Sequence, residues 1–236
     1  MTQMLASVSS LAEAVIALET GVDIVDLKNP ATGALGALSH EEIRAIVDAV
    51  AGVKPVSATI GDLPMDPELL MFDAAHTAQT GVDFIKIGFF GSNGHRSCIR
   101  ALKPLADTDT RLVAVLFADQ EHDFSLLLEL KQAGFYGVML DTAEKNGNNL
   151  LDYITPEKIR SFILMAKSYG LQSGLAGSLK QRHIPSLAKL QPDYLGFRGA
   201  ICINLQRTSA LSKNKLQDVR ALLLKNNIVF SNMISR

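Results

Sequence analysis

The sequence predicts an α/β protein folded as a single-domain (β/α)₈ barrel over residues 1–236. Short apolar strand-like runs alternate with amphipathic helical stretches along the whole chain, with no linker between them. Eight strand–helix units of roughly 30 residues each account for the 236 residues, close to the length typical of a TIM barrel. No GxGxxG pattern follows the first strand, which favours the barrel over an open doubly wound sheet.

The predicted strands are mostly continuous in apolar residues, as is typical of parallel strands buried on both faces. Because a helix follows each strand, we expect the carboxyl ends of all strands to meet at one end of the barrel. In chain order, the predicted strands are Met4–Val8, Asp23–Leu27, Pro55–Ile60, Asp83–Ile87, Leu112–Phe117, Gly137–Leu140, Gln172–Ala176 and Tyr194–Phe197.

Helix boundaries carry recognisable start and stop residues. Ser10 precedes one predicted helix, and Ser39 begins a Ser-His-Glu-Glu capping-box spacing before another. Asp66 and Thr155 each precede a proline, which suits the first turn of a helix. Glycines at the ends of three helices suit left-handed caps. The four predicted helices are Leu11–Glu19, Ile43–Val50, Glu68–Thr80 and Glu157–Tyr169, and the three glycines are Gly21, Gly81 and Gly134.

Composition excludes several classes of function. The formal net charge of −1 provides no broad basic surface for nucleic acid. The absence of a run of about 18 apolar residues and of a basic, apolar N-terminal signal predicts a cytoplasmic protein that binds no membrane. Cys98 and Cys202 are far apart and are expected to be reduced thiols. Neither the cysteines nor the histidines have metal-ligand spacing, so no metal or cofactor is expected.

Charged side chains lie at the ends of strands two, four and six. Asp26 and Lys28 end the second strand, Lys86 the fourth and Asp141 the sixth, with Lys145 on the loop that follows. Asp26 and Lys28 are two residues apart, so they share one face of their strand. Alternate strands of a barrel contribute to the same layer of side chains, so we expect these groups to converge at its mouth.

Two interpretations fit these lysines and acids. Structural ion pairs could close the top of the barrel, because buried charges are costly unless they are paired. Alternatively, clustered cations depress one another's pKa, and a neutral lysine amine attacks an aldehyde or ketone while a carboxylate moves protons. We favour the second interpretation, which is Schiff-base chemistry; the residues alone leave open which lysine is the nucleophile.

Small residues at the ends of strands seven and eight predict a phosphate site. They let backbone N–H groups approach an anion, a following helix N-terminus favours negative charge, and barrels commonly bind phosphate here. Ser178 adds a hydroxyl and Arg198 adds a positive charge. The candidate phosphate- and substrate-binding residues are Ala176, Gly177, Ser178, Arg198, Gly199, Ala200 and, at the end of strand three, Asp62.

Segments in the same order along essentially the whole chain resemble one known family. They are Val25–Pro30, Val56–Asp62, Phe84–Gly88, Leu140–Ala143, Leu175–Leu179 and Arg198–Cys202. They are similar to the (5-formylfuran-3-yl)methyl phosphate synthases of methanofuran biosynthesis, also named 4-(hydroxymethyl)-2-furancarboxaldehyde-phosphate synthases. The resemblance implies that two molecules of glyceraldehyde 3-phosphate condense into a furan aldehyde phosphate, a lyase reaction that releases phosphate and water.

The resemblance also implies roles for the charged residues. Lys28 is the expected Schiff-base lysine, assisted by Asp26, Lys86, Asp141 and Lys145. From the residues themselves, we expect the two acids to shuttle protons and the two other lysines to lower the pKa of Lys28 or hold a phosphate. Dihydroxyacetone phosphate is an alternative to glyceraldehyde 3-phosphate as the triose that forms the enamine.

Other functions remain as alternatives. A different Schiff-base aldolase or a phosphosugar isomerase would share the lysines and the phosphate loops and differ in product. A non-catalytic barrel that binds phosphorylated metabolites would show no turnover and no covalent lysine adduct.

Three segments have two interpretations each. The apolar run Phe162–Met165 is a candidate contact in a homo-oligomer or an ordinary helix packed on the barrel. Arg220–Arg236, with a polar break at Lys225–Asn227, is an oligomer contact or a loosely ordered tail. Phe89–Gly94 is a mobile loop or packs over the barrel rim.

Overall fold

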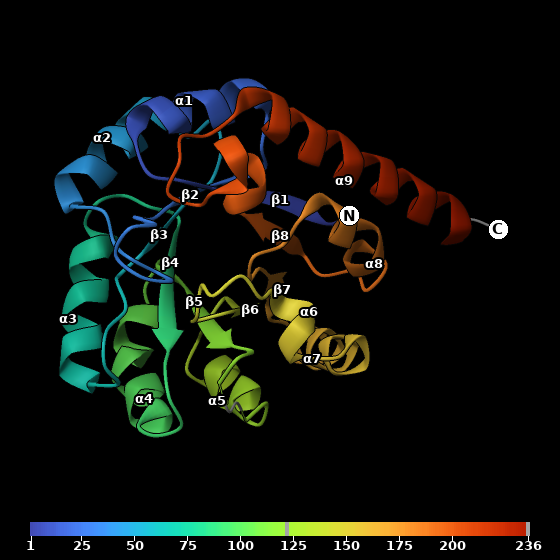
Figure 1. Ribbon diagram of the computed structural model, residues 1–236. Coiled ribbons are helices and arrows are strands. Elements are labelled where there is room, and N and C mark those ends of the chain that lie inside the picture. Colours follow the sequence, from blue (N-terminus) through green and yellow to red (C-terminus); the bar gives the residue numbers. More distant parts are fainter. Residues whose placement is uncertain (121–122, 235–236) are drawn as a thin grey trace.

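The computed structural model of the protein describes residues 1–120 and 123–234, and in them eight parallel strands close into a barrel. Each strand pairs with the next, and the last pairs with the first, which confirms the predicted (β/α)₈ TIM barrel (Figure 1). The strands are β1 Gln3–Val8, β2 Ile24–Leu27, β3 Val56–Thr59, β4 Phe84–Phe89, β5 Arg111–Phe117, β6 Gly137–Asp141, β7 Gln172–Leu175 and β8 Tyr194–Phe197.

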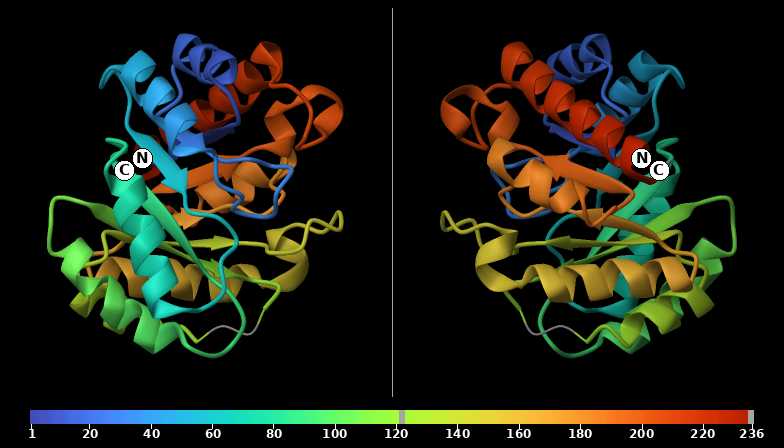
Figure 2. Two further views of the ribbon diagram at one scale, coloured as in Figure 1. Left: turned by 90° about the vertical axis from the view of Figure 1, so that its left-hand side faces the viewer. Right: turned by 90° about the vertical axis from the view of Figure 1, so that its right-hand side faces the viewer.

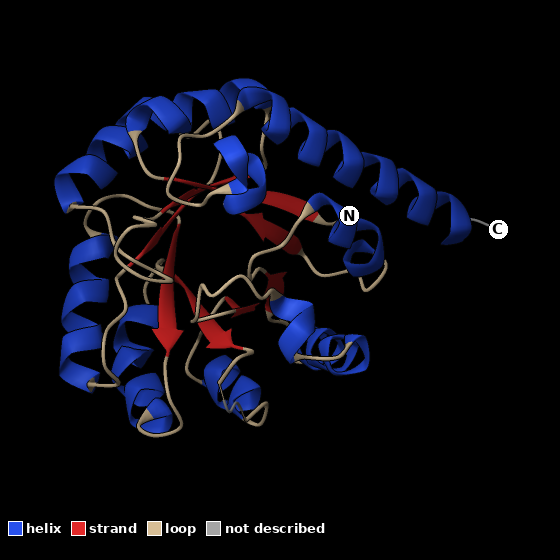
Figure 3. Cartoon of the chain, in the orientation of Figure 1, coloured by secondary structure: helices blue, strands red, loops and turns tan. Residues whose placement is uncertain are grey.

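Helices surround these strands on the outside (Figure 3). In the described residues they are α1 Leu11–Thr20, α2 His40–Val50, α3 Pro67–Ala78, α4 His95–Ala106, α5 Leu126–Gln132, α6 Leu150–Tyr153, α7 Pro156–Ser168, α8 Ile184–Ala188 and α9 Lys213–Ile234. Short 3₁₀ turns lie at Gln181–His183, Gly199–Ile201 and Ile203–Leu205.

The predicted helix starts are confirmed by their hydrogen bonds. The side chains of Ser10, Asp66 and Thr155 each accept a hydrogen bond from a backbone N–H of the first turn. Ser39 forms the predicted reciprocal capping box. Gly21 ends α1 in the left-handed conformation, with φ of 76°. Local sequence therefore sets where these helices begin, whereas the C-caps of α3 and α5 are Gln79 and Ala133, before the predicted glycine caps Gly81 and Gly134.

Aspartates at the start of three strands fix the amino end of the barrel. Asp23, Asp83 and Asp193 each accept a hydrogen bond of 2.7 to 2.8 Å from a backbone N–H of the neighbouring strand. Each aspartate directly precedes its own strand, so its carboxylate ties the turn before that strand to the preceding strand of the barrel.

Two apolar clusters form the core. One fills the space between the strands and the helices, and a smaller one lies inside the barrel. Phe84, Met139 and Tyr194 belong to the inner cluster, and Phe84 and Tyr194 begin their strands. Part of the inner cluster therefore fills the amino end of the barrel, and Phe117, the last residue of β5, extends it to the carboxyl end.

The C-terminal segment differs from its predicted form. α9 continues without a break through Lys225–Asn227 and extends beyond the barrel in Figure 1. Asn227 is buried, its side chain accepts a hydrogen bond from the Thr2 N–H at 3.1 Å, and it donates one to the Thr2 carbonyl at 2.9 Å. The polar stretch therefore attaches α9 to Thr2, the residue before β1. Residues 235–236 of the predicted tail, like His122, lie outside the described residues.

The other two segments pack on the molecule itself. Phe162 and Ile163 are buried, so only Leu164, 59% exposed, projects fully from that run for contact with another copy. Phe90 stacks on Phe117 with ring centroids 4.3 Å apart, which favours packing over the rim. Cys98 and Cys202 are buried and unpaired. None of the helices in residues 1–120 and 123–234 is long and apolar enough to span a membrane.

Candidate active site

A cavity of about 280 Å³ opens at the carboxyl ends of the strands. The loops that follow β2, β6 and β8 project from this end of the barrel in both views of Figure 2. All five predicted catalytic residues line this cavity: Asp26, Lys28, Lys86, Asp141 and Lys145. The structure therefore brings together side chains from three alternate strands and one loop, as the strand ends predict.

Asp26 is fully buried and accepts hydrogen bonds from three side chains. Ser7 and Ser57 lie directly opposite Asp26 on the neighbouring strands and donate to it at 2.7 and 2.6 Å. The Lys86 ammonium lies 2.5 Å from the Asp26 Oδ1 atom. Burial favours the protonated acid, but the charges of Lys86 and Lys28 and these hydrogen bonds outweigh it and lower the pKa of Asp26. Asp26 is therefore a fixed carboxylate.

Asp141 forms the second ion pair of the cavity. Its Oδ1 atom accepts hydrogen bonds from the Thr142 N–H at 2.7 Å and from Lys145 at 3.1 Å. Although burial raises the pKa of Asp141, the charges of Lys145 and Lys28 lower it further, so the net change is downward. Within the described residues, its Oδ2 atom accepts no hydrogen bond, so one oxygen is left for a molecule in the cavity.

Lys28 differs from the other two lysines. It follows the last residue of β2, its backbone N–H donates to the Val8 carbonyl at 3.1 Å, and its side chain is 7% exposed. Its amine forms no ion pair or hydrogen bond with any described residue. Burial, more than the neighbouring cations, lowers the pKa of Lys28 to about 8, against the opposing charge of Asp141.

The loop after β7 contains two consecutive residues with positive φ. Ala176, Gly177 and Ser178 line the cavity. Gly177 has φ of 94°, and a Cβ atom there would lie 3.0 Å from the Thr142 side chain. Ser178 also has a positive φ, 50°, a strain that is typical of functional positions. The chain then enters a 3₁₀ turn at Gln181–His183 and the short α8 instead of a long helix.

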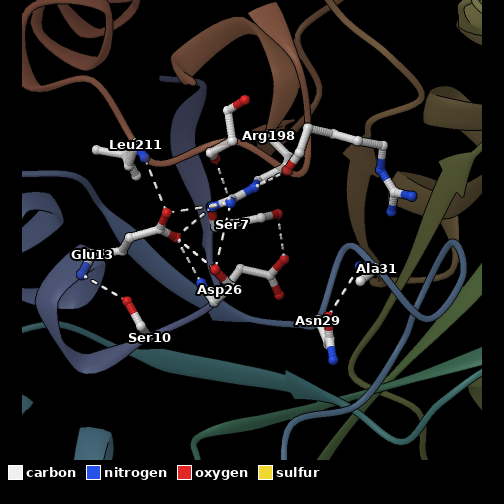
Figure 4. A network of polar contacts seen from close by, with 11 residues as sticks. Ser7, Ser10, Glu13, Asp26, Asn29, Ala31, Arg198 and Leu211 are labelled. Atoms are coloured by element: carbon white, nitrogen blue, oxygen red, sulfur yellow. Dashed lines mark hydrogen bonds and ion pairs between the residues drawn. The ribbon is translucent and has the colours of Figure 1, made fainter. Parts of the chain in front are cut away.

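Arg198 differs from its predicted role. Gly199 and Ala200 line the cavity with it, but its guanidinium forms a buried ion pair with Glu13, at 2.5 Å, and donates to the Ser7 carbonyl at 3.2 Å. Figure 4 shows Ser7 between this pair and Asp26. The charge of Arg198 is thus neutralised by Glu13 within the protein.

Asp62 does not reach the cavity. Its carboxylate accepts hydrogen bonds from the N–H groups of Ala34 and Leu35, both at 2.7 Å. It lies so close to Gly33 that a Cβ atom on that residue would be 2.0 Å from its Oδ2 atom. Asp62 therefore supports the loop between β2 and α2 and is not among the residues that line the cavity.

The sequence did not single out three polar residues that line the cavity: Ser7, Lys180 and Arg207. Ser7 lies within the predicted strand Met4–Val8 and Lys180 follows the predicted phosphate loop, so strand register and loop position could have indicated them. Arg207 lies between β8 and α9 in a stretch without periodicity, and only its place after the last strand pointed to the mouth of the barrel.

Comparisons with known proteins show which family the chain is similar to. A family model described as 4-HFC-P synthase matches residues 4–220. A protein of Methylorubrum extorquens is 41% identical over 89% of this chain and 86% of its own length. The (5-formylfuran-3-yl)methyl phosphate synthase of Methanothermobacter thermautotrophicus is 33% identical over 89% of this chain and 94% of its own. That of Archaeoglobus fulgidus is 37% identical over 85% and 90%.

Solved structures with low sequence identity share the fold alone. 3-Hexulose-6-phosphate synthase from Salmonella typhimurium is 19% identical, with a TM-score of 0.65 over 95% of this chain and 100% of its own. Phosphoribosyl anthranilate isomerase from Thermus thermophilus is 14% identical, with a TM-score of 0.67 over 95% of this chain and 99% of its own.

Proposed function

Since the chain belongs to the 4-HFC-P synthase family, we propose that it condenses two molecules of glyceraldehyde 3-phosphate into (5-formylfuran-3-yl)methyl phosphate. The atoms balance when one phosphate and two water molecules leave, because two three-carbon units supply the six carbons of the product. One phosphate stays on the product. The observation that carries this proposal is the buried, unpaired amine of Lys28 beside a loop suited to phosphate.

Lys28 is the Schiff-base lysine in this proposal. With a pKa of about 8, about a quarter of the Lys28 amines are neutral at pH 7.5, against roughly one in a thousand for a lysine with a pKa of 10.5. A neutral amine attacks the aldehyde carbon and forms a carbinolamine, which loses water to give the imine. Loss of a proton next to the imine carbon then gives the enamine that attacks the second triose.

Asp141 and Lys145 move the protons of these steps. The free Oδ2 atom of Asp141 accepts a proton from carbon or from the attacking amine, and the Lys145 ammonium supplies one to the departing hydroxyl. Asp26, with three donors, is less suited to proton transfer than we expected from the sequence. It fixes the Lys86 ammonium inside the barrel, where that positive charge favours the neutral form of Lys28.

Incubation of the purified protein with glyceraldehyde 3-phosphate alone tests the reaction. Mass spectrometry should detect a six-carbon furan aldehyde monophosphate, and free phosphate should appear in equal amount. A product that is only an isomerised triose or a non-aromatic sugar phosphate would indicate a different phosphosugar enzyme. No turnover and no adduct would indicate a binding protein.

Borohydride trapping tests the lysine. Addition of borohydride during turnover should attach one triose to Lys28, located by peptide mass spectrometry. Lys28→Ala should abolish this adduct, and persistent trapping at another lysine would refute the assignment. Lys167→Ala, an exposed lysine in the last turn of α7, is the matched control and should trap normally.

A further inference from the structure

Six cationic side chains line the cavity, and three of them pair with a carboxylate. Lys86 pairs with Asp26, Lys145 with Asp141, and Arg198 with Glu13 outside the cavity wall. The remaining cavity-lining cations, which form no ion pair with any described residue, are Lys28, Lys180 and Arg207. Lys28 is the proposed nucleophile, so Lys180 and Arg207 are the two cations left without a carboxylate partner among the described residues.

Arg207 extends from the loop after β8 to the loop after β2. Its backbone carbonyl accepts a hydrogen bond from the Arg198 Nε–H at 2.7 Å, and its own Nη2 atom donates to the Gly33 carbonyl at 2.7 Å. Arg207 is anchored at both ends, yet only one of its five N–H donors has a described partner. The other donors are available to an oxyanion in the cavity.

The loop that carries Arg207 is strained. Asn204 and Leu205 are consecutive non-glycine residues with positive φ, 55° and 58°. Non-glycine residues rarely adopt this left-handed conformation, and such strain persists where the surrounding structure requires it. Leu205 also lines the cavity although 57% of it is exposed. The loop conformation therefore brings a cation and an apolar side chain to the cavity mouth.

Lys180 belongs to a different part of the wall. It follows Gly177 and Ser178 in the loop after β7, so it adds a positive charge to the phosphate turn already described. Arg207 contacts another loop, because Gly33 lies in the loop after β2, which Asp62 holds in place. The two unpaired cations therefore mark two separate places for an anion.

We infer that Arg207 forms a second phosphate subsite, which binds the phosphate of the second triose while the turn at Gly177–Lys180 binds the phosphate of the triose attached to Lys28. This inference rests on the proposed function, because the condensation requires two phosphorylated substrates in one cavity. Guanidinium is suited to the role, since its planar fork binds phosphate oxygens in pairs.

The Arg207→Gln substitution tests the two phosphate subsites separately. The borohydride adduct at Lys28 should form with the same dependence on glyceraldehyde 3-phosphate concentration as in the unchanged protein. The KM for furan formation should rise on the order of 10- to 100-fold, as expected for the loss of charge-assisted hydrogen bonds to phosphate. Arg207→Lys, which keeps the charge and loses the fork, should show a smaller rise and covers the case in which the glutamine variant does not fold. Arg182→Gln, an exposed cation that does not line the cavity, should change neither quantity.

Inorganic phosphate tests the subsite without turnover. Calorimetric titration should find two phosphate sites in the unchanged protein and one in Arg207→Gln. Three results would overturn the inference. The KM could be unchanged in both Arg207 variants, or Arg207→Gln could lose the Lys28 adduct to the same extent as the product. The third is a single phosphate site in the unchanged protein. Absence of furan product from the unchanged protein would instead refute the proposed function, and the phosphate titration would still decide the subsite.

Discussion

Lys28 should lower the stability of the folded protein at neutral pH. Its side chain is buried, and its pKa falls from 10.5 to about 8 on folding. Each pKa unit corresponds to about 1.4 kcal/mol, so the protonated lysine costs about 3 kcal/mol of unfolding free energy. Methionine has a similar length and no charge. Lys28→Met should therefore stabilise the protein at pH 7 by about 3 kcal/mol while it abolishes Schiff-base formation.

The pH dependence distinguishes this explanation from a simple gain in packing. Below pH 8, both the folded and the unfolded wild-type chains bind the proton, so the full cost is present. Between pH 8 and pH 10.5, the folded chain has lost the proton and the unfolded chain still binds it, so wild-type stability rises relative to the variant. The advantage of Lys28→Met should decrease through this window and largely vanish above it.

Urea unfolding at pH 7 and at pH 10.5, followed by circular dichroism, measures this difference. In a separate thermal melt at pH 7, the melting temperature of Lys28→Met should lie about 6 to 12 °C above that of the wild type, for a chain of this size. Lys167→Met, at an exposed position, should differ from wild type by less than about 0.5 kcal/mol at either pH. Equal or lower stability of Lys28→Met at pH 7, or a difference that does not shrink at high pH, would refute the reasoning.

Two further substitutions test the groups around Lys28. Lys86→Met leaves the fully buried Asp26 without its cation and should lower the unfolding free energy, measured by urea unfolding, by about 3 to 5 kcal/mol. Addition of Asp26→Asn to the same chain removes the unpaired charge and should recover part of that loss. Gly177→Ala places a Cβ atom 3.0 Å from the Thr142 side chain at a φ of 94°, so it should lower the unfolding free energy by about 1 to 2 kcal/mol. It should also raise the KM for glyceraldehyde 3-phosphate, and an unchanged KM would argue against a phosphate role for this turn.

The sequence by itself determined the barrel and the convergence of its charged residues. Both follow from local rules: the strand period places Asp26 and Lys28 on one face, and the barrel brings alternate strand ends to one mouth. Helix starts at Ser10 and Ser39 depend on side chains within three residues of the backbone groups that they satisfy. Such features need no knowledge of distant segments.

Only the tertiary structure decided how the charges are paired. Arg198 lies 185 residues from Glu13, and Asp62 lies 28 residues from the backbone N–H group of Ala34 that it binds, so neither partner could be identified from spacing. The same holds for Arg207, which contacts Gly33 across 174 residues. A charge in a sequence has the same appearance whether the fold neutralises it or leaves it facing a cavity. The physical difference lies in burial and in the distance to an opposite charge, and both arise only when the barrel closes.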